Sequence, residues 1–281
     1  MARPEFGRFG VWLRGTDYTP ELAAGLEDLG YGTLWVGGSP DGDLRSVERL
    51  LAATSRVTVA TGIVNIWKDD AATVGASFRR IEEAYPGRFV LGIGAGHRES
   101  TGDRYDKPYT ALQRYLDVLD AEGVPQDQRV LAALGPRTLR LAADRAAGAH
   151  PYFTAPNHTR QAREILGEGP LLAPEQKVAL ESSPPKARAL ARASLGFYIG
   201  LANYAANFRR MGFTDDDLAD GGSDRMVDSL IAHGTPEAVC DGLTAHLSAG
   251  ADHVAVQLLV SEGADLLTGY RTLAAALGLP G

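Results

Sequence analysis

Several features that define other protein classes are missing from this chain of 281 residues. It has a single cysteine, Cys240, so no disulfide can form within the chain, which is consistent with a reducing compartment. No apolar stretch reaches the ~18 uninterrupted residues that a membrane helix needs. Residues 1–6 also lack the apolar run of a signal peptide. These absences predict a cytoplasmic protein with no membrane partner.

Excess positive charge and the common catalytic signatures are missing as well. The formal net charge of −7 argues against a nucleic-acid partner, and an anionic ligand would need local positive charge. No histidines or cysteines have the spacing of a zinc site, so no metal is expected. Neither a Gly-x-Ser-x-Gly elbow nor a P-loop occurs. The Rossmann pattern fails because Glu99 stands where its last glycine would be.

The chain does contain short apolar runs that alternate with amphipathic stretches. Strands are expected at 9–13, 33–36, 57–64, 89–93, 129–133, 150–153, 176–180 and 253–259. Near-continuous apolar runs are typical of parallel strands that are buried on both faces. Eight such units in this length favour one domain, residues 1–281, folded as an α/β TIM (β/α)8 barrel. A doubly wound sheet with a helical appendage is the alternative.

Helical patterns fill the spaces between these strands. They cover 21–29, 44–54, 73–84, 110–121, 138–147, 160–166, 186–210, 236–249 and 264–277. Glycines follow several helix ends, as at Gly30 and Gly148, where they suit a left-handed cap. In a barrel these joints would lie at the amino ends of the strands. The strand exits would lie at the carboxyl ends, where barrel enzymes place their sites, with insertions expected on that face.

The exit of the fourth strand carries the clearest candidate site. It reads Gly94-Ala95-Gly96-His97, and glycine lets a ligand approach the main chain closely. His97 could transfer a proton near neutral pH. The alternative is a surface or helix-capping histidine.

Other strand exits add polar groups. Gly62 suggests a bulge or a close backbone approach, and Asn65 offers a donor and an acceptor to a heterocycle. After the fifth strand, Pro136 suits a first helical turn whose free amides attract anions, and Arg137 adds positive charge. Ordinary turns with packed or solvated side chains are the alternative at both places.

The later part of the chain is less specific. Thr154, Asn157 and His158 would lie in a loop at the carboxyl face, whereas His150 would start a strand and serve a structural role. The mostly apolar segment 198–208 could line a pocket or an oligomer contact, or simply pack in the core. The acidic segment 215–224 is interpreted as a solvated loop, with a lid or a metal site as alternatives.

The motifs together resemble the bacterial luciferase-like superfamily, and within it the oxidoreductases that use the deazaflavin coenzyme F420. The resemblance spans essentially the whole chain and is carried by residues 34–36, 61–65, 87–96, 132–137 and 249–254. It is more specific for the superfamily than for deazaflavin over FMN. It implies a TIM barrel that holds the cofactor at the carboxyl ends of the strands.

The resemblance also implies a set of cofactor-binding residues. Relatives carry a non-proline cis peptide in the third strand, which would fall at Gly62–Ile63. The other matching positions lie after the third, fourth, fifth and sixth strands: Asn65; Ala95, Gly96 and Ser100; Leu134, Gly135 and Arg137 on the phosphate side; and Thr154.

Two departures limit what the resemblance implies. Sugar-phosphate dehydrogenases of the superfamily place an Asp-His pair after the second strand, where this chain has Gly38 and Ser39. They also place a glutamate base after the fourth strand, where this chain has His97. The sugar-phosphate activity is therefore not expected. His97 is the candidate catalytic residue.

Three functions are compatible with these features. The first is hydride transfer between coenzyme F420 and a small organic substrate. The second keeps the fold but uses FMN in a luciferase-like monooxygenase. The third is a barrel that binds a flavin or deazaflavin without turnover. A homodimer is expected only because superfamily members are often dimers.

Overall fold

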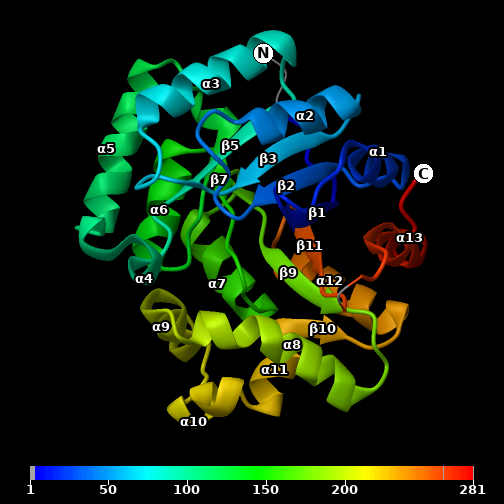
Figure 1. Cartoon of the computed structure of the whole chain (residues 1–281). Helices are drawn as coiled ribbons and strands as arrows, with labels where there is room; N and C mark the ends of the chain where they lie inside the picture. The colour runs from blue at the N-terminus through cyan, green and yellow to red at the C-terminus, as the bar shows by residue number, and fades with distance from the viewer. Residues whose placement is uncertain (1–3, 262, 281) are drawn as a thin grey trace.

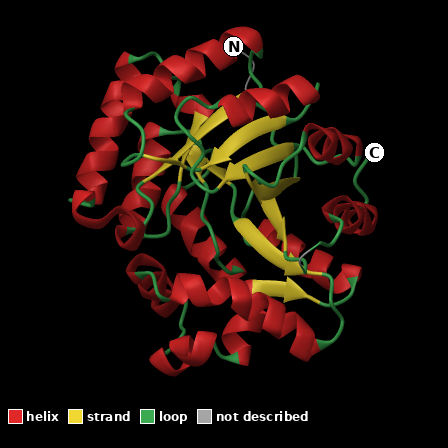
Figure 2. Cartoon of the chain, viewed as in Figure 1, coloured by secondary structure: helices red, strands yellow, loops and turns green. Residues whose placement is uncertain are grey.

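The chain forms an α/β fold in which a parallel sheet curls into a half-barrel with helices around it (Figures 1 and 2). The computed structural model describes residues 4–261 and 263–280, so residues 1–3 of the amino-terminal segment discussed above lie outside it. The strands are β1 (Phe9–Arg14), β2 (Thr33–Gly37), β3 (Thr58–Gly62), β4 (Val64–Asn65), β5 (Phe89–Gly94), β6 (Arg129–Leu131), β7 (Gly148–Ala149), β8 (Leu171–Leu172), β9 (Glu175–Ala179), β10 (Ile231–His233) and β11 (Val254–Leu258).

The strand order follows the chain over most of the sheet. It is β10-β9-β11-β1-β2-β3-β5-β6-β7-β8, with β4 paired to β5. Every recorded pairing is parallel, as in Phe9 beside Val254 and Gly10 beside Thr33. One segment, 171–179, joins distant parts of this order, because β8 pairs with β7 while β9 pairs with β11. Such pairings require the sheet to be strongly curved.

Helices follow most strands and cover the outer side of the sheet (Figure 2). Several begin at a Thr, Asp or Ser whose side chain accepts a backbone N–H of the first turn, as Thr19, Asp70 and Thr235 do. Their bounds are α1 (Pro20–Asp28), α2 (Arg45–Ala53), α3 (Ala71–Ala84), α4 (Arg98–Thr101), α5 (Pro108–Ala121), α6 (Pro136–Arg145), α7 (Pro156–Leu166), α8 (Pro184–Ile199), α9 (Ala202–Arg210), α10 (Asp215–Leu218), α11 (Asp224–Leu230), α12 (Pro236–Ser248) and α13 (Leu266–Leu277). None of the described helices is both long and apolar enough to cross a membrane.

The strands bury both faces, in two different environments. Val11, Leu34 and Val59 belong to the large core shared with the outer helices. Their neighbours along the strands point the other way and form a separate inner cluster of Trp12, Trp35, Ala60, Val90, Val130, Ala173 and Ala255. One residue from each of several strands therefore fills the inside of the curve, as layers of side chains do in barrels.

One strand prediction is wrong, and two short strands were not predicted. Residues 150–153 are not a strand; β7 is Gly148–Ala149, so His150 follows the strand rather than starting it. Pro151 has no N–H with which to continue the ladder, and Phe153 has φ 57°, in the left-handed region. The two-residue strand β8 and the three-residue strand β10 were not predicted, because such short runs give little periodic signal.

The region between β9 and β10 also differs from the sequence prediction. The helix expected over 186–210 is two helices, α8 and α9, interrupted at Gly200 and Leu201. The acidic segment is not simply a loop, since it contains α10 and the start of α11. Asp217 closes a capping box with Thr214 and pairs with Arg225, which gives it a structural role. These helices gather on one side of the sheet beside β9 and β10 (Figure 1).

Candidate functional site

A cavity of about 610 Å³ opens where the carboxyl ends of several strands meet helices α8 and α9. The lining combines residues at the carboxyl ends of β1 and β3 or just after β2, β3, β5, β6 and β7 with Phe197, Tyr198, Tyr204 and Arg210 from α8 and α9. Parallel strands end at one edge of a sheet, so loops from distant parts of the chain converge there. The cavity has the size and mixed polar and apolar lining of a small-molecule or cofactor site.

Most of the residues proposed from the sequence meet at this cavity. The lining includes Gly62, Ile63, Asn65, Ala95, Gly96, His97, Ser100, Leu134 and Gly135. The peptide bond between Gly62 and Ile63 is cis, as the family resemblance implies. Gly38 and Ser39, which stand where sugar-phosphate dehydrogenases have their Asp-His pair, also line the cavity.

Two proposed residues do not reach the cavity wall. Arg137 is exposed, and its guanidinium lies over the ring of Tyr109, 3.8 Å from the centroid. Tyr109 lines the cavity, so Arg137 contacts a residue of the wall without lining the cavity itself. Thr154 is fully buried, and its hydroxyl has no hydrogen-bond partner among the described residues. It follows Phe153, whose φ of 57° lies in the left-handed region, and it does not line the cavity.

Glycines bring bare backbone to the cavity at two positions where a side chain would not fit. A Cβ on Gly96 would lie 2.5 Å from Nδ2 of Asn65, and Gly96 has φ +60°. A Cβ on Gly62 would lie 2.7 Å from Nε1 of Trp12 and 3.2 Å from Nε2 of His150. Asn65 is fixed in turn, because its Oδ1 accepts the backbone N–H of Trp67 at 2.9 Å. Glycine at these two positions therefore lets the side chains of Asn65, Trp12 and His150 pack directly against the main chain of the cavity wall.

A donor and an acceptor without partners flank Gly62. Nδ1–H of His150 donates to the carbonyl of Ala173 at 2.7 Å. Burial lowers the pKa of His150 to about 3, so its ring is neutral and Nε2 is left as an acceptor. Nε1–H of Trp12 is a donor, and neither atom has a hydrogen-bond partner among the described residues. Buried polar atoms are usually paired, so this pair is available to a ligand.

His97 lies on the same cavity wall, beside an aromatic group. Its ring centroid is 5.4 Å from that of Tyr204 and 6.5 Å from that of Tyr198. Burial lowers the pKa of His97, against the opposing effects of Asn203 and Glu99, so the imidazole is neutral near pH 7. Glu99 accepts the backbone N–H of Ala202 at 3.0 Å, which ties the loop that carries His97 to the start of α9.

Positive charge gathers at the start of α6. Gly135 is the N-cap residue of this ten-residue helix, Pro136 occupies its first turn, and no side chain caps it. The guanidinium of Arg210 lies 3.8 Å from the position of a Cβ on Gly135. Burial lowers the pKa of Arg210, which nevertheless stays charged at neutral pH. The positive end of a helix dipole beside an arginine suits a phosphate group.

Several lining residues were not singled out from the sequence. They include Trp12 and Arg14 of β1, Tyr152 after β7 and Arg210 at the end of α9. Segment 198–208 was predicted to line a pocket or an oligomer contact, or to pack in the core. It both lines the cavity and packs in the core. Tyr204 and Phe208 pack in the cluster beneath α8 and α9, while Tyr198, Asn203 and Tyr204 line the cavity. The position of Arg14 at a strand exit was the one sequence signal that could have identified it.

Comparison with known proteins supports the resemblance to luciferase-like proteins. Residues 8–123 match the family described as luciferase-like monooxygenase. That range runs from β1 to just beyond α5 and includes the cavity residues from Trp12 to Leu112. The sequence resemblance is thereby confirmed.

Two curated relatives cover most of the chain and have different activities. A 5,10-methylenetetrahydromethanopterin reductase of Archaeoglobus fulgidus is 24% identical over 85% of this chain and 87% of its own. A 4-hydroxyprotoasukamycin monooxygenase of Streptomyces nodosus subsp. asukaensis is 25% identical over 79% of this chain and 69% of its own.

Solved structures support the same fold. The coenzyme F420-dependent tetrahydromethanopterin reductase of Methanopyrus kandleri has a TM-score of 0.75 at 17% identity, covering 96% of this chain and 98% of its own. The oxygenating constituent of 3,6-diketocamphane monooxygenase from Pseudomonas putida, solved with FMN, has a TM-score of 0.68 at 14% identity, covering 96% and 97%. Structural neighbours thus include both F420-dependent and FMN-binding proteins.

Proposed function

We propose that the protein is an oxidoreductase that transfers a hydride between the deazaflavin coenzyme F420 and a small organic substrate. The cavity supports this proposal most strongly. It combines a backbone wall at Gly62 and Gly96, an unpaired donor and acceptor at Trp12 and His150, and a cationic helix start near Arg210. A flat heterocycle with a phosphate-bearing tail would use all three.

The residues present fit such a cofactor. Gly62, Ile63 and the segment from Ala95 to Gly96 would flank the ring, with Asn65 offering a donor and an acceptor to its edge. Ser100, Leu134 and Gly135 would contact the rest of the cofactor, and Arg210 with the start of α6 would hold its phosphate. Arg137 would add long-range positive charge from its position over the ring of Tyr109. Thr154 would support the wall from its buried position.

The bound deazaflavin would supply the hydride chemistry, and the protein would supply orientation, exclusion of water and proton handling. Phe197, Tyr198 and Tyr204 would cover the substrate on the side of α8 and α9. His97 would hold or move a proton at its Nδ1, which has no partner among the described residues. Its neutral ring suits accepting a proton at neutral pH.

An FMN-dependent monooxygenase is the second candidate. The relative from Streptomyces nodosus and the FMN complex from Pseudomonas putida favour it. The reductase from Archaeoglobus fulgidus favours the first, with a larger share of both chains aligned. The absence of an Asp-His pair at Gly38 and Ser39 bears on the substrate and not on the choice between the two cofactors.

Titration of the purified protein with each cofactor tests the proposal. We expect coenzyme F420 to bind more tightly than FMN, followed by the change in cofactor fluorescence. Reduced F420 should then be reoxidised by members of a panel of aldehydes, ketones and enones. Preferential binding of FMN would overturn the choice of cofactor. Tight F420 binding without turnover on any member would favour a non-catalytic binding protein.

Three further inferences accompany this function. We infer that segment 171–179 closes the curved sheet into a (β/α)8 barrel, with α8 to α11 as an insertion at its carboxyl face. The pairing of β8 with β7 and of β9 with β11 supports this closure. A homodimer and a cytoplasmic location stay predictions. Light scattering of the purified protein would check the first, and fractionation of the source cells the second.

A further inference from the structure

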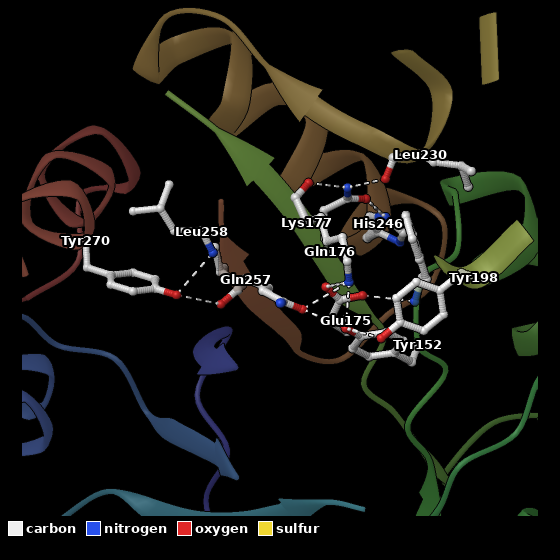
Figure 3. A network of polar contacts seen from close by, with 12 residues as sticks. Tyr152, Glu175, Gln176, Lys177, Tyr198, Leu230, His246, Gln257, Leu258 and Tyr270 are labelled. Atoms are coloured by element: carbon white, nitrogen blue, oxygen red, sulfur yellow. Dashed lines mark hydrogen bonds and ion pairs between the residues drawn. The ribbon is translucent and has the colours of Figure 1, made fainter. Parts of the chain in front are cut away.

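A buried ion pair lies beneath the aromatic side of the cavity. Nζ of Lys177 is 3.0 Å from Oε1 of Glu175, both on β9, and neither side chain is exposed to solvent (Figure 3). Burying two charges costs desolvation energy that their attraction often fails to offset, so such a pair is weak evidence for a purely stabilising role. The surrounding contacts indicate a different purpose.

The ammonium group of Lys177 uses all three of its donors. Besides Glu175, it donates to the hydroxyl of Tyr152 at 2.7 Å and to Oε1 of Gln257 at 3.0 Å. The other oxygen of Glu175 accepts the backbone N–H of Phe153 at 2.9 Å. Both charged groups are therefore held in one geometry, with the lysine aimed at Tyr152.

A short path of hydrogen bonds leads from this pair to the cavity. The hydroxyl of Tyr198 donates to that of Tyr152 at 3.1 Å, and both tyrosines line the cavity (Figure 3). The hydroxyl of Tyr152 can also donate to Gln257, at 2.9 Å. If it rotates from Gln257 toward Tyr198, the proton of Tyr198 is free to point at a ligand. Lys177 itself does not line the cavity, so it reaches a ligand only through the two hydroxyl groups.

The charges that face Lys177 determine which group in the network gives up a proton. Burial lowers the pKa of Lys177 to about 8, with the attraction of Glu175 opposing and Arg14 of β1 adding to the decrease. Burial raises the pKa of Tyr152 and of Tyr198, so both stay neutral at pH 7. Lysine is then the proton source, and the tyrosines carry the proton without accumulating charge.

We propose that Tyr198 donates a proton to the carbonyl oxygen of the substrate, and that Tyr152 and Lys177 replace that proton along the hydrogen-bonded path. The inference rests on the proposed function, and it narrows the substrate to a carbonyl compound or an enone. Neutral His97 on the same wall is suited to accepting a proton rather than supplying one. Tyr198 is therefore the acid in this step.

A bound reduced deazaflavin would supply the hydride that forms a C–H bond at the carbonyl carbon of the substrate. The π electron pair of the carbonyl would move to its oxygen. That oxygen takes the proton of Tyr198, which takes the proton of Tyr152, which takes one from the Lys177 ammonium. Lys177 ends as a neutral amine beside charged Glu175. Water that enters after product release returns the proton by the same path.

Lysine NMR on the protein without cofactor tests the proton source. Besides Lys177 the chain has only Lys68, Lys107 and Lys186, so ¹³C-labelled lysine gives few signals, and a Lys177→Met variant assigns the one that matters. We expect the Lys177 signal to titrate near pH 8, because burial lowers the pKa of this lysine. A Lys177 signal that stays in its charged form up to pH 10 would overturn the relay, whichever cofactor the protein uses.

Kinetics with reduced F420 and three probes, 4-nitrobenzaldehyde, cyclohexanone and cyclohexenone, test the path. Wild-type kcat should fall as the pH rises through about 8, because the acid form of Lys177 is lost. Tyr198→Phe and Lys177→Met should lower kcat about 100-fold, with little change in KM, and should lose this pH dependence. Lys186→Met, on the exposed side of α8, should behave as wild type.

Gln257→Leu separates a relay from a structural network. It removes contacts to Tyr152 and Lys177 but leaves the path to Tyr198 intact, so it should lower thermal stability and keep the decrease in kcat near pH 8. If Tyr198→Phe keeps full kcat and the wild-type pH profile, the relay is overturned and the proposed function stands. If the wild-type protein neither binds nor reoxidises reduced F420, the proposed function is overturned and the relay with it.

Discussion

Polar groups at the two ends of the parallel strands differ in how they are hydrogen-bonded. At the amino ends, Glu27 accepts the backbone N–H groups of Ser55, Arg56 and Val57, just before β3. Arg88, just before β5, donates to carbonyl groups of the same region. At the carboxyl ends, buried polar atoms face a cavity without partners.

This contrast separates stability from function within one sheet. Nε1 of Trp12, Nδ1 of His97 and Nε2 of His150 are buried and have no hydrogen-bond partner among the described residues. Leaving a buried polar atom unpaired costs about 1–3 kcal/mol, so the carboxyl end is destabilised unless a ligand completes it. At the amino end, the hydrogen-bonded charges of Glu27 and Arg88 offset part of that cost, although Nη1 of Arg129, at the start of β6, has no partner among the described residues. Substitutions at the two ends should therefore have different consequences.

The largest effect is expected at the carboxyl end, on catalysis. His97→Ala should lower kcat about 100-fold, because a proton-transfer group is lost, and should leave the affinity for F420 nearly unchanged. Steady-state kinetics and a cofactor titration on the same preparation measure both. His233→Ala, which removes a histidine paired with Asp228 elsewhere, is the control and should keep wild-type turnover. Unchanged turnover in His97→Ala would contradict its catalytic role.

The next effect belongs to the amino end, on stability. Burial would raise the pKa of Glu27, but the N–H groups of Val57, Arg56 and Ser55 outweigh it and lower the pKa to about 2. The folded pKa lies below the unfolded one, so this stabilisation is present above about pH 4.5 and is lost as the pH falls toward 2.

Glu27→Gln should therefore lower the free energy of unfolding by about 2 kcal/mol at pH 7, and by clearly less at pH 3, where part of the stabilisation is already lost. Urea denaturation at both pH values measures the difference. Glu21→Gln, on the same helix but exposed, is the matched control. F420 affinity should not change in either variant. Equal destabilisation of Glu27→Gln at pH 7 and pH 3 would rule out the charge as the cause.

A smaller effect is expected on cofactor affinity, at a glycine of the cavity wall. Gly96→Ala places a Cβ 2.5 Å from Nδ2 of Asn65, at φ +60°, and should weaken F420 binding about tenfold. Gly102→Ala is the control, because it has φ +65° and nothing within 4 Å of the added atom. Both variants carry the backbone strain, and only the first displaces Asn65. Equal cofactor affinity in the two would contradict a ligand contact at Gly96.

The smallest effect concerns the anionic part of the ligand. Arg210→Gln should weaken F420 binding severalfold, and less so at high salt, since a partly exposed charge is screened. Arg209→Gln is the control, because that arginine pairs with Asp215 and does not line the cavity. Isothermal titration at low and high salt compares the two. An equal loss in both variants would indicate a general charge effect and no phosphate contact at Arg210.

Local sequence patterns predicted much of the fold. The apolar runs at β1, β2, β3, β5, β9 and β11 were long enough to be recognised as strands. The glycine-rich exits after β3, β5 and β6 placed Gly62, Gly96 and Gly135 at the cavity. Strand β7 was misplaced because Pro151 and the left-handed Phe153 break an apolar run that otherwise resembles a strand. Strands β8 and β10 were missed because they are too short for a pattern.

The buried network of β9 could not be predicted from sequence. Glu175 and Lys177 are two residues apart, which places them on the same face of a strand, but sequence does not say which face is covered. Their partners Tyr152 and Gln257 come from distant segments, and α8 supplies Tyr198. Only the curvature of the sheet brings these residues together.

The unpaired indole N–H of Trp12 allows the most direct test of the proposed cofactor site. The chain has three tryptophans, so the ¹⁵N-indole spectrum is simple, and Nε1 of Trp35 already donates to His253 at 3.0 Å. Addition of F420 should shift the Trp12 indole signal as the cofactor completes its hydrogen bonding, and should leave the Trp35 signal in place. A Trp12 signal that stays unchanged at saturating F420 would contradict a cofactor site at the carboxyl ends of the strands.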